Sequence, residues 1–80
     1  MSKQDLRKSI ECILNTYTQI VMCLGLDQHI GYDDLIMKIL DDNSSEEDID
    51  LNQLVINTTE ILTELGRTMT CIESVIYVEL

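Results

Sequence analysis

Apolar residues recur along two stretches of this chain, at intervals that alternate between four and three residues. The first stretch comprises Leu6, Ile10, Ile13, Tyr17, Ile20 and Leu24. The second stretch comprises Leu51, Val55, Thr58, Leu62, Leu65, Met69, Ile72 and Ile76. Only Thr58 breaks the apolar rule. A mean spacing of about 3.5 residues is typical of helices that pack lengthwise against one another. The pattern therefore predicts two long amphipathic helices.

The first of these helices is expected over residues 2–24. Ser2 has the side chain of an N-cap, and Gly25 suits the left-handed conformation that ends many helices. Residues 25–31 then form a turn. A shorter second helix is predicted over residues 32–42, because it begins with acidic residues that would meet the unpaired N–H groups of a first helical turn.

A third helix is expected over residues 46–65, after a polar linker. The four–three rhythm then crosses Gly66 without a change of phase, which predicts a fourth helix over residues 67–79. This last helix is either continuous with the third or separated from it at Gly66. A strand over residues 68–78 is the alternative, because the segment is rich in β-branched residues.

These elements predict an all-α fold: a three- or four-helix bundle with long amphipathic first and last helices, in a single domain over residues 1–80. A chain of 80 residues buries a small core, so we also expect a helical dimer. Eight apolar residues are predicted to lie in the core or in a partner or dimer interface, and these two interpretations stay open. They are Leu6, Ile10, Ile13, Leu62, Leu65, Met69, Ile72 and Ile76.

The net charge of −10 is concentrated between residues 27 and 50, which hold nine acidic side chains and one basic one. We predict an acidic surface there, formed by Asp41, Asp42, Glu46, Glu47, Asp48 and Asp50. Lys and Arg supply most of the affinity for phosphates, so direct binding to nucleic acid is disfavoured. A solvated polar face is the alternative interpretation of these acids.

The sequence offers little for catalysis or for metal binding. A calcium loop that started at Asp41 would need Gly at its sixth position and Glu at its twelfth, where Glu46 and Asn52 stand. His29 is the only histidine, which argues against zinc ligation and against an activated nucleophile. We therefore expect no enzyme activity, no cofactor and no metal.

The cysteines Cys12, Cys23 and Cys71 are odd in number, and we expect them to be reduced in a cytoplasmic protein. An intermolecular disulfide through Cys71 is the alternative. No secretory signal is recognisable, and the longest apolar run, residues 20–24, is far too short to span a membrane.

One segment of the chain, residues 30–62, resembles a known family. The matching positions are Ile30, the run from Asp34 to Leu40, Asp48, Ile49 and the run from Thr58 to Leu62. They are similar to the small bacterial biofilm-development and acid-resistance regulators, also called two-component-system connector proteins. The resemblance implies a dimeric, all-helical modulator that acts on signalling or nucleoid-associated partners.

The leading prediction is thus a non-enzymatic regulator or adaptor that dimerises and binds a protein partner through apolar helix faces. A second prediction is an acidic mimic of nucleic acid that inhibits a DNA- or RNA-binding protein. A third is a secretion-type chaperone or immunity protein that covers an apolar helix of its client.

Overall fold

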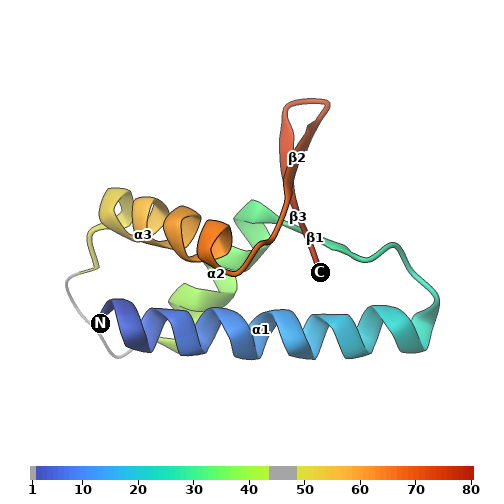
Figure 1. Cartoon of the computed structure of the whole chain (residues 1–80), viewed down its shortest axis with the longest axis horizontal. Helices are drawn as coiled ribbons and strands as arrows, with labels where there is room; N and C mark the ends of the chain where they lie inside the picture. The colour runs from blue at the N-terminus through green and yellow to red at the C-terminus, as the bar shows by residue number, and fades with distance from the viewer. Residues whose placement is uncertain (1, 44–48) are drawn as a thin grey trace.

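The computed structural model describes residues 2–43 and 49–80, and within them the chain forms three helices and one antiparallel sheet (Figure 1). The elements are α1 (Lys3–Leu24), β1 (His29–Gly31), α2 (Tyr32–Asp42), α3 (Leu51–Glu64), β2 (Met69–Ile72) and β3 (Val75–Glu79). The sheet has the strand order β1-β3-β2, so β3 is central and β2 lies at an edge. The hairpin of β2 and β3 projects away from the helices in Figure 1.

The prediction of an all-α bundle is wrong, because the segment expected to form a fourth helix over 67–79 folds as the β2–β3 hairpin. The turn expected over 25–31 also contains a strand, β1. The third helix begins at Leu51 rather than near residue 46. Residue 46, at which this helix was predicted to begin, lies outside the described part of the chain.

The ends of α1 follow directly from local sequence. The Ser2 hydroxyl accepts a hydrogen bond from the Asp5 backbone N–H at 3.1 Å, which confirms the predicted N-cap. Gly25 adopts φ 67°, and the N–H of Leu26 donates to the carbonyl of Val21 at 2.9 Å. This six-to-one bond defines a Schellman motif and confirms the predicted C-terminal glycine.

A second Schellman motif explains why the chain does not continue as a helix past Gly66. Gly66 has φ 73°, and the N–H of Arg67 donates to the carbonyl of Leu62 at 2.9 Å. The N–H of Gly66 donates to the carbonyl of Thr63 at 3.1 Å. These bonds satisfy the last carbonyls of α3 and redirect the backbone toward the sheet.

The hairpin closes through two residues, Glu73 and Ser74, whose φ angles are 50° and 67°. Positive φ at both central positions is the signature of a type I′ turn, whose twist matches that of paired strands. In the sheet, Val78 of β3 lies opposite Ile30 of β1 and Met69 of β2. Val78 is fully buried, so this row of residues attaches the sheet to the core.

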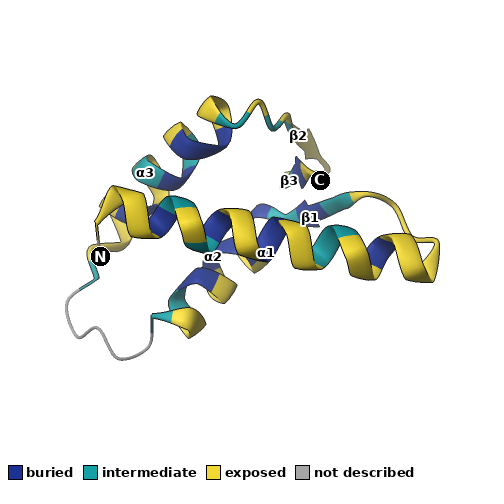
Figure 2. Cartoon of the chain, turned by 60° about the horizontal axis from the view of Figure 1, so that its bottom comes forward, coloured by how far each residue is buried: buried dark blue, intermediate teal, exposed yellow. Residues whose placement is uncertain are grey.

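The core gathers side chains from all three helices and from the sheet (Figure 2, dark blue). Its buried members are Leu6, Ile10, Ile13, Leu14, Ile30, Tyr32, Leu35, Ile36, Ile39, Leu54, Ile61, Leu62 and Val78. Thr58 is the one polar residue buried among the described residues. Burial of this set is the main favourable term that holds the helices against the sheet.

An exposed ion-pair cluster joins the start of α1 to the end of α3. Lys3 Nζ donates to Glu60 Oε2 at 3.1 Å, and Arg7 donates to Glu64 Oε2 at 2.9 Å. The hydrogen bond to Glu60, supported by Glu64, raises the pKa of the Lys3 ammonium above its ordinary value. Lys3 and Arg7 thus compensate two acidic side chains of α3, Glu60 and Glu64.

Candidate functional site

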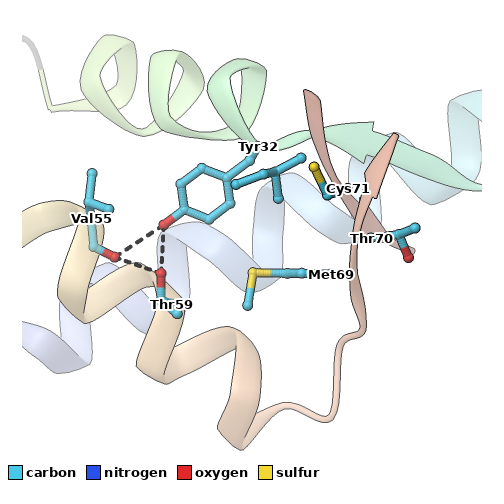
Figure 3. A pocket seen from close by; sticks show the side chains of 7 residues that line it. Tyr32, Val55, Thr59, Met69, Thr70 and Cys71 are labelled. Carbon is cyan, nitrogen blue, oxygen red and sulfur yellow. Dashed lines mark hydrogen bonds between the residues drawn. The ribbon is translucent and has the colours of Figure 1, made fainter. Parts of the chain in front are cut away.

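The described surface has an apolar groove between α3 and the hairpin, with a volume of about 360 Å³ (Figure 3). We call it the α3–hairpin groove. Its lining residues are Tyr32, Val55, Thr59, Met69, Thr70, Cys71 and Ile76. They come from α2, α3, β2 and β3, so the groove exists only because the C-terminal segment forms a hairpin and turns back past α3.

The register of the hairpin determines which side chains enter the groove. Cys71 lies opposite Ile76, two residues along from the pair formed by the partly buried Met69 and the buried Val78. Alternate residues of a strand share one face of the sheet, so Cys71 and Ile76 point to the same side as the core-facing pair. At this distance from the core the helices no longer cover the sheet, and Ile76 remains 46% exposed.

One end of the groove is fixed by hydrogen bonds between α2 and α3. The Tyr32 hydroxyl lies 3.1 Å from the Val55 carbonyl oxygen and 2.9 Å from Thr59 Oγ1. Thr59 Oγ1 in turn lies 2.9 Å from the same Val55 carbonyl. The polar atoms of Tyr32 and Thr59 therefore bond to each other and to α3, which leaves the groove with an apolar character.

The lining carries hydroxyl groups and the Cys71 thiol, but no His, Lys or carboxylate side chain. Nucleophilic catalysis needs a base beside the hydroxyl or thiol, so the groove lacks the partner that would activate its nucleophiles. The described residues also contain no group of three or more His, Cys, Asp or Glu side chains that is placed to bind a metal ion. The groove is suited to binding apolar groups.

The eight predicted core or interface residues divide into three groups. Leu6, Ile10, Ile13 and Leu62 are buried in the core, whereas Leu65 and Met69 are partly buried against it. Ile72 and Ile76 are exposed on the hairpin, at 53% and 46%. Only Met69 and Ile76 of this set line the groove, which the sequence could not place without the hairpin.

Three of the six predicted surface acids lie in the described residues. Asp41 and Asp42 are exposed at the end of α2. Asp50 is also exposed, and its carboxylate accepts hydrogen bonds from the N–H groups of Asn52 at 3.0 Å and Gln53 at 3.3 Å. Asp50 is thus the N-cap of α3. Glu46, Glu47 and Asp48 lie outside the described residues.

The free cysteines are all exposed, and only Cys71 contributes to the groove. Cys12 and Cys23 lie on α1. His29, which we expected in a turn, lies in β1 with its ring 4.8 Å from that of Tyr77 between centroids. None of the helices in the described ranges combines the length and the hydropathy that crossing a bilayer would require.

Comparison with protein families, with curated proteins and with solved structures finds no match for this chain. The resemblance to the connector proteins therefore stays a prediction, and the all-helical fold that it implied is wrong. Along the described chain the elements follow the order of a helix, a strand, two helices and a terminal hairpin.

Helix α3 carries two acidic side chains, Glu60 and Glu64, and has no Lys or Arg. The segment from residue 68 to residue 80, which includes the hairpin, also has no Lys or Arg. Contacts to the phosphates of nucleic acid depend mostly on Lys and Arg, and neither α3 nor the hairpin presents such residues.

Proposed function

We propose that the protein is a non-catalytic interaction module, a regulator or adaptor, that binds a segment of another protein in the α3–hairpin groove. The groove itself is the observation that carries this proposal. Exposed apolar surface is costly for a small domain, and a concave apolar site of this size points to a ligand. The uncharged lining favours insertion of apolar side chains.

The partner that fits best presents apolar side chains from a basic protein. The groove supplies contact area, and the net charge of −10 supplies long-range attraction for a positively charged partner. Acidic side chains outside the groove, such as Asp33 and Asp34 at the start of α2, are exposed to provide this attraction. Charge would then govern the association rate, whereas the groove would govern the lifetime of the complex.

The proposal is tested by partner capture with two matched variants. Val55→Gln makes the wall of the groove polar, and Met37→Gln makes the same kind of change on the exposed surface of α2. Val55 is 38% exposed and Met37 is 61% exposed, so both side chains can be replaced without emptying the core. Melting curves followed by circular dichroism would establish that both variants fold.

We expect a protein that co-purifies with the wild type and with Met37→Gln, and is lost with Val55→Gln. Its retention in high salt would indicate apolar contacts. Equal recovery with both variants would refute the groove as the binding site. Recovery with both variants and release by salt would favour the acidic nucleic-acid mimic instead, whose exposed carboxylates include Asp41 and Asp42.

A further inference from the structure

Strand β2 has one free edge. In the described sheet it pairs only with β3, and the Thr68 carbonyl accepts a hydrogen bond from the N–H of Glu79 at 2.9 Å. Backbone groups alternate in direction along a strand, so Thr70 and Ile72 also point toward β3. Met69 and Cys71 must therefore direct their N–H and C=O groups away from the sheet.

This edge lacks the features that usually protect one. Proteins commonly block an exposed edge with Lys, Pro, a bulge or a covering segment. The sequence Met-Thr-Cys-Ile of β2 contains no charge and no Pro, and its pairing with β3 is regular. Thr70, Cys71 and Ile72 are all exposed, and the hairpin projects from the helices (Figure 1).

We propose that two copies of this chain pair through β2, antiparallel, and join their sheets into one continuous six-stranded sheet. A two-fold axis relates identical strands in such a pair, so one residue faces its own copy. With Thr70 on the axis, Met69 lies opposite Cys71 of the second copy, and the same pairing repeats by symmetry. All outward backbone groups of Met69 and Cys71 are then bonded.

The alternative register, with Cys71 on the axis, is poorer. It would pair Met69 with Glu73 of the second copy, which lies in the turn beyond the end of the strand. Only the two backbone hydrogen bonds between Cys71 and its copy would then have the geometry of an antiparallel ladder. The register centred on Thr70 therefore makes more hydrogen bonds.

Charge supports the same register and explains why the occupant of the edge is a second copy. Most surfaces of a chain with net charge −10 repel an identical chain, but residues 68–72 carry no charge. With Thr70 on the axis, Glu73 of each copy falls opposite Arg67 of the other. Within the described residues, neither Glu73 nor Arg67 has an ion-pair partner in its own chain; Arg67 is partly buried, and its Nε is buried without a hydrogen-bond partner.

This inference goes beyond the proposed function and does not depend on it. The edge of β2 is distinct from the wall that α3 contributes to the groove, and Val55→Gln leaves the edge intact. A protein that dimerises but captures no partner would support the edge pairing and refute the groove. A monomer that captures a partner through Val55 would do the reverse.

The first test compares Cys71→Pro with Cys71→Ser. Proline removes an N–H that points to solvent and would be accepted at such an edge position, whereas serine keeps it. Light scattering over concentrations up to about 1 mM should give twice the 9.2 kDa monomer mass for the wild type and Cys71→Ser, and the monomer mass for Cys71→Pro. A wild type that stays monomeric would overturn the proposal, as would a Cys71→Pro variant that folds and still dimerises.

The second test fixes the register by disulfide trapping with two variants that each carry a single cysteine. One is Thr70→Cys with all three native cysteines replaced by serine, and the other keeps only the native Cys71. A cysteine at position 70 would face its copy in a non-hydrogen-bonded pair, with Cα atoms about 4.5 Å apart, which permits a disulfide. Native Cys71 with Cys12 and Cys23 replaced would face its copy diagonally, at about 7–8 Å, which is too far. Thr70→Cys should therefore cross-link much faster. Preferential cross-linking through Cys71 would refute the register.

A third test exchanges the charges of Glu73 and Arg67 and measures whether dimerisation is restored, which a misfolded variant would not show. Glu73→Arg and Arg67→Glu should each weaken the dimer, and the double variant should restore it, because the opposed charges are exchanged. Additive loss in the double variant would contradict the pairing of Glu73 with Arg67 of the second copy.

Discussion

Thr58 allows the clearest test of the packing of α3. Its side chain is fully buried, and among the described residues its Oγ1 has no hydrogen-bond partner. A buried hydroxyl without a partner loses its bonds to water on folding, which costs about 1–3 kcal/mol. Thr58→Val removes this cost, keeps the branched shape, and introduces a residue of similar helix propensity.

We therefore expect Thr58→Val to raise the free energy of unfolding by about 1 kcal/mol, with a rise in Tm of about 4–8 °C for a domain of this size. Urea denaturation and thermal melting, both followed by far-UV circular dichroism, would measure the change. The matched variant Thr58→Ser keeps the hydroxyl and removes the methyl group, so it should destabilise by about 1 kcal/mol through lost apolar burial. A loss of stability in Thr58→Val would show that the hydroxyl is satisfied in solution and would refute the reasoning.

Three further predictions concern the turn, the ion pairs and the groove. Ser74→Gly should raise the free energy of unfolding by about 0.5–1 kcal/mol in denaturant titrations, because glycine adopts φ 67° without strain. Unchanged or reduced stability would contradict the I′ turn. The raised pKa of Lys3 means that its stabilising effect is complete below the ordinary lysine pKa and declines as pH rises through the higher folded value. In Lys3→Gln this loss of stability at alkaline pH should be absent, so the curves of unfolding free energy against pH should differ between the wild type and the variant. Curves of identical shape would count against the ion pair with Glu60. Tyr32→Phe should lower the free energy of unfolding by about 1 kcal/mol in the same titrations, through loss of the hydrogen bonds to α3. A neutral result would mean that the hydroxyl is equally well hydrated in the unfolded chain.

The helices were predictable from the sequence because the residues that define their ends act over only a few positions of the chain. The Ser2 hydroxyl and Gly25 act on atoms within a few residues, so their effect does not depend on the rest of the fold. The structure places α1 and α2 within one residue of the ranges expected for them. The start of α3 depends on Asp50 as N-cap, whereas the helix was expected to begin at residue 46.

The hairpin was not predictable in the same way, because both of its usual signals are weak here. Its turn is Glu73-Ser74, without the Asn or Gly that typically occupies positive φ. Its strands are apolar on both faces at Ile72, Val75 and Ile76, so no alternation of polar and apolar residues marks a period of two. Gly66 was the better clue, because it forms the same helix-ending motif as Gly25.

For the same reason, the candidate groove could not be predicted from the sequence. Its walls are separated along the chain, from Tyr32 through Val55 to Ile76, and only the hairpin register brings them together. Met69 and Ile76 were expected at an interface because of a helical rhythm that the structure does not contain. Their presence in the groove therefore reflects their apolar character and not the predicted geometry.

The four–three spacing also predicted the wrong buried face for part of α1, although α1 is a helix as expected. A strict seven-residue repeat drifts by about 20° per heptad relative to a straight helix, unless the helix supercoils around a partner. The buried face of α1 passes through Ile10 and Leu14 to Val21, whereas the rhythm leads to Ile20 and Leu24, which are 47% and 65% exposed. The core thus follows the straight helix. Ile20 and Leu24 therefore lie away from the buried face, because a straight helix does not keep a seven-residue repeat on one side.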